Sequence, residues 1–229
     1  MPSFQDFYFQ TSTGRTSIHA LKCVPDGKPR AVVQIAHGIA EHIDRYRPFM
    51  EFLADNGFVA AGNDHLGHGK SIRVPEEQGF FAEKDGWWRV VDDMGKLHDI
   101  MSKEYPELPY VLFGHSMGSF LTRTYLIKHP DKYDGVILSG TGHQSPALVL
   151  GGNAAASVMA KLNGAMGDGA KLDSLAFGTY LNKIENPRTK FDWLSRDTEQ
   201  VDKYIADPLC GFVGKIGLYR DMMQGIKFI

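Results

Sequence analysis

The sequence predicts an α/β fold in which helices cover both faces of a mostly parallel sheet. Four short, nearly continuous apolar runs have the composition of strands that are buried on both faces. Amphipathic segments of helical period lie between these runs, and this alternation is typical of a doubly wound sheet. The 229 residues, 43% hydrophobic and 23% charged, have the ordinary composition of a globular chain with one sizeable core.

The N-terminal segment predicts an antiparallel hairpin. Apolar and polar residues alternate over residues 6–10 and 17–23, on either side of Thr13 and Gly14. This alternation is typical of strands with one face in water. We therefore expect the hairpin at an edge of the sheet.

The central elements follow in order along the chain. The expected buried strands are residues 31–36 (AVVQIA), 58–62 (FVAAG), 110–113 (YVLF) and 135–138 (GVIL). The expected helices between them are residues 46–56, 87–104 and 117–129, each with apolar side chains at three-residue or four-residue steps. The first of these helices should end at Gly57.

The pattern changes after Gly140, because residues 147–229 contain helical stretches and no run typical of a buried strand. A helical insertion after a sheet strand should lie over the carboxyl ends of the strands, where open α/β sheets bind ligands. We therefore expect a catalytic core in residues 1–142, and a cap with the start of a return to the core in residues 143–229. The uncharged residues 147–160 are too few to span a bilayer, which takes about 20, and are interpreted as a helix that covers something apolar. Their lack of charge favours a substrate with an acyl chain.

Charge and cysteine content exclude several classes of function. The net charge is −2, the isoelectric point is near 6.5, and no run of Lys or Arg could follow a phosphate backbone, so no nucleic-acid partner is expected. Cys23 and Cys210 lack metal-ligand spacing and are expected to be free thiols in a reducing compartment. The first residues resemble no secretory signal, so a cytoplasmic location is expected.

The most informative motif is Gly114-His115-Ser116-Met117-Gly118, which directly follows an expected strand and precedes an expected helix. This context is that of a nucleophile elbow, in which small residues two positions either side of the serine avoid collision with the strand and helix backbones. Ser116 is therefore the candidate nucleophile, and Gly114 and Gly118 are the elbow glycines. The alternative is a serine in a purely structural turn.

A second motif, HGIAEH at residues 37–42, directly follows the first buried strand. A tetrahedral intermediate needs two backbone N–H donors, one after the nucleophile and one from this loop. We assign these donors to Met117 and Ile39, and Gly38 would allow the loop backbone to approach closely. The alternative is that His37 and Gly38 only close a tight turn.

A third motif, DHLGHGKS at residues 64–71, contains two glycines and three polar side chains that could bind metal. The interpretation that we favour is a tight loop in which Asp64, His65 and His68 hydrogen-bond to the backbone. Binding of a metal ion is the less favoured alternative.

Together, HGIAEHIDRY, DHLGHGKS and GHSMGS resemble the monoacylglycerol lipase and lysophospholipase branch of the α/β-hydrolase superfamily, also labelled serine aminopeptidase S33-like. The resemblance covers the whole chain, including residues 191–212, which look like the family's return from cap to sheet. The family's first motif is usually HGxGEH, whereas this sequence has Ala40 at the fourth place.

The resemblance implies an α/β-hydrolase fold with a helical cap, and no metal or cofactor. It implies a serine carboxylic-ester hydrolase that acts on a monoacylglycerol, a lysophospholipid or a similar acyl ester through an acyl-enzyme. Glu41 and Arg45 match the family's glycerol-contacting residues. Thioester hydrolysis and amino-terminal peptide cleavage occur on the same fold and stay open, and transient contact of the cap with a membrane surface is a further expectation.

The general base of such an enzyme is not evident in this sequence. In this fold an Asp or Glu and then a His follow the serine, but only His129 and His143 do so here. His129 should lie at the far end of the helix after the elbow, and His143 lacks an evident orienting acid. The resemblance implies that the triad Asp and His belong to two further strand-and-loop units, roughly 60 to 90 residues.

Two hypotheses follow. In the first, a second chain, a swapped partner or a segment beyond an incomplete record supplies the missing Asp and His. In the second, the chain is an inactive fragment that binds ligand without turnover. In either case the last strands of the fold are missing, and the strand at residues 135–138 should form an unpaired, apolar edge.

Overall fold

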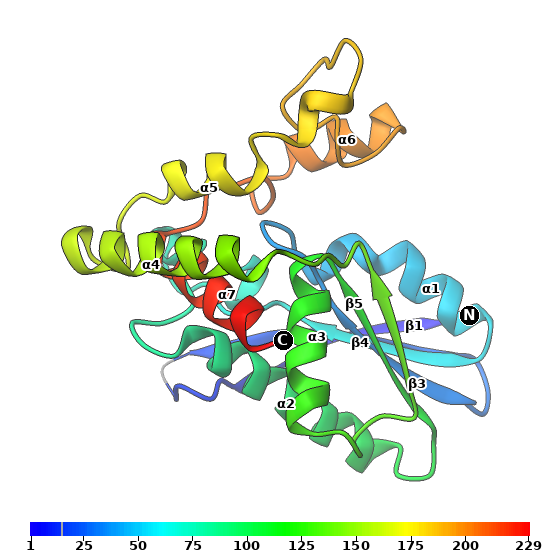
Figure 1. Cartoon of the computed structure of the whole chain (residues 1–229). Coiled ribbons are helices and arrows are strands. Elements are labelled where there is room, and N and C mark those ends of the chain that lie inside the picture. The colour runs from blue at the N-terminus through cyan, green and yellow to red at the C-terminus, as the bar shows by residue number, and fades with distance from the viewer. Residues whose placement is uncertain (15) are drawn as a thin grey trace.

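The computed structural model describes residues 1–14 and 16–229, and its centre is a six-stranded sheet of order β1-β2-β4-β3-β5-β6 (Figure 1). The strands are β1 (Ser3–Gln10), β2 (Ser17–Val24), β3 (Ala31–Ala36), β4 (Phe58–Asn63), β5 (Tyr110–His115) and β6 (Gly135–Ser139). Strand β2 pairs antiparallel with β1 and β4, whereas β4, β3, β5 and β6 run parallel. The predicted edge hairpin and the predicted parallel strands are confirmed.

Helices cover both faces of the sheet, and the alternation of side chains along each strand explains how. On β4, Ala60 belongs to a buried cluster with Met50 of α1 (Arg47–Asp55). Its neighbours Val59 and Ala61 belong to the cluster on the other face, with Leu97 of α2 (Gly86–Glu104). Because neighbouring residues of one strand point to opposite faces, an all-apolar strand needs a helix on each side.

The predicted boundaries differ from the observed ones by at most three residues, and those of β3 coincide. The first expected helix begins as a 3-10 turn, η1 (Ile43–Tyr46), and continues as α1, which has a proline in its first turn and ends before Gly57 at a φ of +83°. The remaining elements before the cap are η2 (Gly69–Ser71), η3 (Pro75–Glu77) and α3 (Met117–Lys128).

The predicted insertion forms helices beyond one end of the sheet, and its last helix returns to the core (Figure 1). We call α4 (Pro146–Asn163), α5 (Ala170–Phe177) and α6 (Thr198–Ala206) the cap helices; η4 (Tyr180–Lys183) lies between α5 and α6. Helix α7 (Ile216–Phe228) contacts α2, α3 and α4, and a Cβ on Gly225 would lie only 2.0 Å from the Trp87 ring. Among the helices of the described residues, none has the length and hydropathy to cross a bilayer.

Strand β6 forms an exposed apolar edge, as expected. Val136 is 38%, Ile137 51% and Leu138 39% exposed, and within the described chain β6 pairs with β5 alone. Unpaired backbone groups beside apolar side chains are a template for pairing with another chain.

We expect Ile137→Lys to reduce self-association of the 229-residue chain, because a charge on an open strand edge disfavours edge-to-edge pairing. The measurement is the fraction of monomer in sedimentation velocity over a range of concentrations. Ile127→Lys is the matched control, since Ile127 is equally exposed, at 56%, but lies on α3. If both variants gain the same fraction of monomer, the reduced self-association results from the change in net charge and not from the exposed edge of β6.

Candidate active site

Ser116 lies at the turn between β5 and α3 in a strained backbone conformation. Its φ of 52° and ψ of −119° fall in a region that costs a non-glycine residue about 1–3 kcal/mol. The Ser116 N–H donates to the Ser139 carbonyl of β6 at 2.9 Å, and the Ser116 carbonyl accepts from Ser119 N–H at 2.8 Å. These hydrogen bonds hold the turn on both sides, so the strand, sharp turn and helix of an elbow are all present.

The two elbow glycines are required by close backbone contacts. A Cβ on Gly118 would lie 2.0 Å from the Ala36 carbonyl oxygen at the end of β3. A Cβ on Gly114 would lie 2.6 Å from the Gly118 carbonyl oxygen. Since side-chain carbons do not approach other atoms so closely, only glycine fits at either position.

The loop after β3 lies directly against the serine. A Cβ on Gly38 would be 3.2 Å from the Ser116 Cβ, so the absence of a side chain allows the backbone to approach. Ile39 follows on this loop, and Met117 is the first residue of α3. Within the described chain, neither the Ile39 nor the Met117 N–H donates to a protein acceptor. Within the described residues, both amides are therefore unpaired.

Ser116 lines a cavity of about 400 Å³ whose lining is partly polar and partly apolar. Glu41, Arg45 and His115 are among its polar residues. The apolar residues of the lining include Phe177 of α5, Leu181 of η4, Trp193 and Leu194. The lining can therefore contact both polar and apolar groups of a ligand.

The uncharged residues 147–160 form a helix that covers apolar neighbours, as expected, but they do not line this cavity and so give no support for an acyl chain in it. They form most of α4, whose side toward the core packs against α7, where a Cβ on Gly152 would lie 2.6 Å from the Met223 methyl carbon. The apolar wall comes instead from α5, η4 and the chain before α6. The lack of charge in residues 147–160 correctly predicted a helix that packs against the core. It did not show which part of the protein this helix covers.

Glu41 and Arg45 are both at the cavity, but the Glu41 carboxylate is already engaged within the protein. Glu41 is only 5% exposed, and its Oε1 accepts from Gly38 N–H at 2.6 Å and from the Tyr46 hydroxyl at 2.9 Å. Its Oε2 accepts from the Arg45 guanidinium, which also lies 4.9 Å from the centre of the Tyr204 ring. Arg45 is the more exposed partner and is the one able to meet a ligand.

Comparison with known proteins assigns the family. The family model described as serine aminopeptidase, S33 (Hydrolase_4) matches residues 27–229. The chain belongs to this family. It is 32% identical over 190 residues to a monoacylglycerol lipase of Mycolicibacterium smegmatis, covering 81% of this chain and 58% of the relative. It is 30% identical to a rat monoglyceride lipase, covering 83% of this chain and 55% of the relative.

Solved structures agree on the fold. A thermostable carboxyl esterase from Bacillus coagulans, in complex with glycerol, superposes with a TM-score of 0.90 at 32% identity and covers 99% of this chain and 73% of its own. A lipase in an open form superposes with a TM-score of 0.85 at 25% identity, covering 98% and 73%. The predicted α/β-hydrolase fold is confirmed. The chain spans little more than half the length of the curated relatives described above.

Ala40 departs from the glycine usual in the motif of this S33 family, and the structure shows a backbone that glycine would favour. Its φ is 52°, in the left-handed region. The Ala40 carbonyl accepts two hydrogen bonds, one from the Tyr204 hydroxyl of the cap helix α6 at 2.9 Å and one from Gly211 N–H in the segment after α6 at 3.0 Å. These two hydrogen bonds hold the loop after β3 in a conformation that is costly for alanine.

We expect Ala40→Gly to stabilise the protein by about 1 kcal/mol, because left-handed backbone costs an alanine about 1–2 kcal/mol and glycine less. Thermal unfolding should then shift upward by about 2–4 °C for a chain of this size. Ala155→Gly, an exposed position inside α4, is the control and should lower the melting temperature. A lower melting temperature in both variants would contradict the assignment of backbone strain to Ala40.

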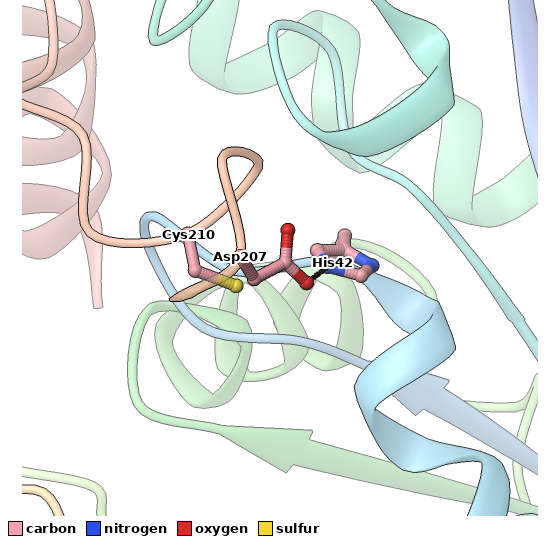
Figure 2. A group of neighbouring side chains, drawn as sticks. All are labelled: His42, Asp207 and Cys210. Atoms are coloured by element: carbon pink, nitrogen blue, oxygen red, sulfur yellow. Dashed lines mark hydrogen bonds and ion pairs between the residues drawn. The ribbon is translucent and has the colours of Figure 1, made fainter. Parts of the chain in front are cut away.

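A second contact joins the loop after β3 to the segment after α6 (Figure 2). His42 Nε2 and Asp207 Oδ2 are 2.8 Å apart, and potential ligand atoms of His42, Asp207 and Cys210 all lie within 4.8 Å of one another. Burial raises the pKa of the Cys210 thiol to about 12, so a metal ion would have to displace its proton as well as the His42–Asp207 hydrogen bond. The hydrogen-bonded pair accounts for the contact. Both cysteines are free, as predicted, and both are buried.

The loop at residues 64–71 is held by hydrogen bonds to its own backbone and to η1, which confirms the favoured interpretation. Asp64 Oδ1 accepts from Ile43 N–H and Oδ2 from Lys70 N–H, both at 2.8 Å. His68 Nδ1 donates to the Leu66 carbonyl at 2.9 Å. Asp64 Oδ2 also lies 2.8 Å from Nδ1 of the buried His19.

We expect the stability contributed by His19 to depend on pH. Burial alone would lower the pKa of His19, but hydrogen bonds to Asp64 and to Asp6 raise it above the ordinary value. A folded-state pKa above the unfolded one gives stability that is fully present below about pH 6.5 and is lost as pH rises through the folded value.

The test is the difference in unfolding free energy between wild type and His19→Asn from pH 5 to 9, which should be largest at the acid end. His68→Asn is a control of opposite sign. Because burial lowers the pKa of His68 to about 4, only the unfolded chain binds this proton below about pH 6.5, and the stability that His68 contributes is smallest at the acid end. If the difference in unfolding free energy between wild type and His19→Asn does not change with pH, the pKa of His19 is not raised in the folded state.

The histidines that follow Ser116 lie away from it. His129 ends α3 with its ring 4.6 Å from that of Tyr125, and His143 is exposed beside a different cavity. His115 lines the serine cavity, and its Nδ1 lies 3.1 Å from Ser139 Oγ. No feature of the sequence indicated this residue, because it occupies the variable position of the motif. Among the described residues, none hydrogen-bonds to Ser116 Oγ.

Proposed function

We propose that this chain carries the acylation site of a serine carboxylic-ester hydrolase. The observation that carries the proposal is the strained Ser116 beside two unpaired backbone amides, in the lining of a partly apolar cavity. Ser116 is the nucleophile, and the Ile39 and Met117 amides form the oxyanion hole. Membership of a family whose relatives are named monoacylglycerol lipase supports this reaction class.

The reaction proceeds in two halves. Ser116 Oγ attacks the acyl carbonyl carbon as its proton passes to a general base, and the carbonyl oxygen becomes an oxyanion that accepts from Ile39 and Met117 N–H. The intermediate expels the alcohol, which takes the proton, and leaves an acyl-enzyme. Water activated by the same base then releases the fatty acid. We propose that a histidine outside residues 1–229, oriented by a carboxylate, supplies this base.

The substrate that we propose is a monoacylglycerol, a lysophospholipid or a similar acyl ester. Its acyl chain would lie along the apolar wall formed by α5 and η4, and its polar head would lie near Arg45 and Glu41. Exposed leucines and a valine on α4 and α5 support transient contact of the cap with a membrane surface; they are Leu148, Val158, Leu162 and Leu175.

A second function, ligand binding without turnover, is favoured by one observation. Within the described chain no imidazole lies in hydrogen-bonding distance of Ser116 Oγ, and a serine without a base is a weak nucleophile. In that case the cavity would bind a lipid, and the oxyanion hole would give only residual hydrolysis.

We expect Ser116→Ala to reduce hydrolysis of a short-chain p-nitrophenyl ester by about 10⁴-fold or more, because the covalent step is removed. In the protein completed by the residues that supply the base, intact mass after incubation with a fluorophosphonate should show one adduct on the wild-type chain that carries Ser116 and none on the variant. Ser195→Ala, which removes another hydroxyl from the same cavity, is the control and should keep both properties.

Either of two results would decide against hydrolysis at Ser116. Full activity of Ser116→Ala would place the reaction elsewhere. A completed wild-type protein that takes no adduct but binds a fatty acid would make ligand binding the better description.

A further inference from the structure

Three histidines beside the oxyanion loop are fully buried and take no part in the proposed chemistry. His37, His65 and His68 each have no exposed surface, and the His37 ring centre lies 4.0 Å from that of His65 and 5.3 Å from that of His68. Burial lowers the pKa of His65 to about 3 and of His68 to about 4, and lowers that of His37 well below its usual range. All three rings are neutral at physiological pH.

The hydrogen bonds of His37 fix which of its nitrogens carries the proton. His37 Nδ1 lies 2.7 Å from the Gly38 carbonyl oxygen, and a carbonyl can only accept, so Nδ1 carries hydrogen. His37 Nε2 accepts from the His65 backbone N–H at 3.0 Å, so Nε2 has none. Both ring nitrogens are satisfied in one tautomer, and the ring cannot flip without losing both bonds.

The Gly38 carbonyl and the Ile39 N–H belong to one peptide unit. A trans peptide is planar, and its carbonyl and N–H point in opposite directions; the described chain has no cis peptide bond. The bond from His37 Nδ1–H to the Gly38 carbonyl therefore also sets the direction of the Ile39 N–H, on the other side of the unit. It polarises the same peptide, which makes its N–H a stronger donor.

The preceding peptide unit is held at both ends as well. The His37 carbonyl accepts from His65 Nε2 at 3.1 Å, and the Gly38 N–H donates to Glu41 Oε1 at 2.6 Å. Without these bonds Gly38, which has no side chain, could rotate at little cost. Three buried side chains, those of His37, His65 and Glu41, thus fix the two peptide units on either side of Gly38.

We infer that His37 is a positioning residue, whose neutral Nδ1–H tautomer aims the Ile39 N–H at the oxyanion, with His65 and Glu41 fixing the adjacent peptide. The inference rests on the proposed function in its last step, since an oxyanion forms only if Ser116 is acylated. Preorganised donors are worth most when they need no reorientation as charge develops. His37 does not touch substrate, and its effect passes through the backbone.

Three variants test the inference in the protein that hydrolyses a short-chain ester. His37→Ala should lower kcat by about 10- to 100-fold with little change in KM, since loss of one oxyanion donor costs about 10²–10³ and here the donor is misdirected rather than removed. His37→Asn should recover most of kcat, because an asparagine amide can donate to the Gly38 carbonyl as Nδ1–H does. His68→Ala removes a ring of the same size and burial that does not bond to the loop, and should keep kcat within about threefold.

A second measurement does not depend on turnover. The rate of hydrogen exchange of the Gly38 amide, followed by NMR, should rise in His37→Ala and stay near the wild-type rate in His37→Asn and His68→Ala. This readout decides the role of His37 even if the wild-type chain shows no hydrolysis, a result that would count against the proposed function alone. Equal losses of kcat and of amide protection in His37→Ala and His68→Ala, without rescue by asparagine, would overturn the inference.

Discussion

The site depends on how closely the elbow approaches the end of β3. The absence of a side chain at Gly118 allows the first turn of α3 to lie against the Ala36 carbonyl. Its absence at Gly38 allows the loop after β3 to lie against Ser116. Because both contacts are backbone to backbone or nearly so, they leave almost no freedom in where the Ile39 and Met117 amides lie relative to the serine. The strain at Ser116 is maintained by this packing, since a looser junction would let the turn relax.

The oxyanion loop is held from two directions. From the core, His37, His65 and Glu41 bond to its peptide groups. From α6 and the segment after it, the Tyr204 hydroxyl and Gly211 N–H bond to the Ala40 carbonyl. The loop is therefore the place where the core and the chain returning from the cap meet, and a displacement of α6 would be transmitted to the backbone beside the nucleophile.

The sequence was informative where structure is decided locally. The strands, the elbow and the loop at residues 64–71 follow from apolar runs, glycines and short-range hydrogen bonds, all of which are visible within a few residues. The lack of charge in residues 147–160 favoured an acyl chain, but these residues do not line the cavity; they pack against α7, in a contact between segments some 70 residues apart. The orienting bonds of His37 and the engagement of Glu41 are equally invisible, since the type of a residue does not reveal which backbone group its side chain meets.

The Glu41–Arg45 pair has an electrostatic consequence for the oxyanion hole. A carboxylate fixed to the Gly38 amide lies close to the point where negative charge develops, and alone it would disfavour that charge by Coulomb repulsion. The Arg45 guanidinium binds the other oxygen of Glu41 and supplies a compensating positive charge at the same cavity. Glu41 can therefore orient the loop without opposing the proposed reaction only while Arg45 remains paired with it.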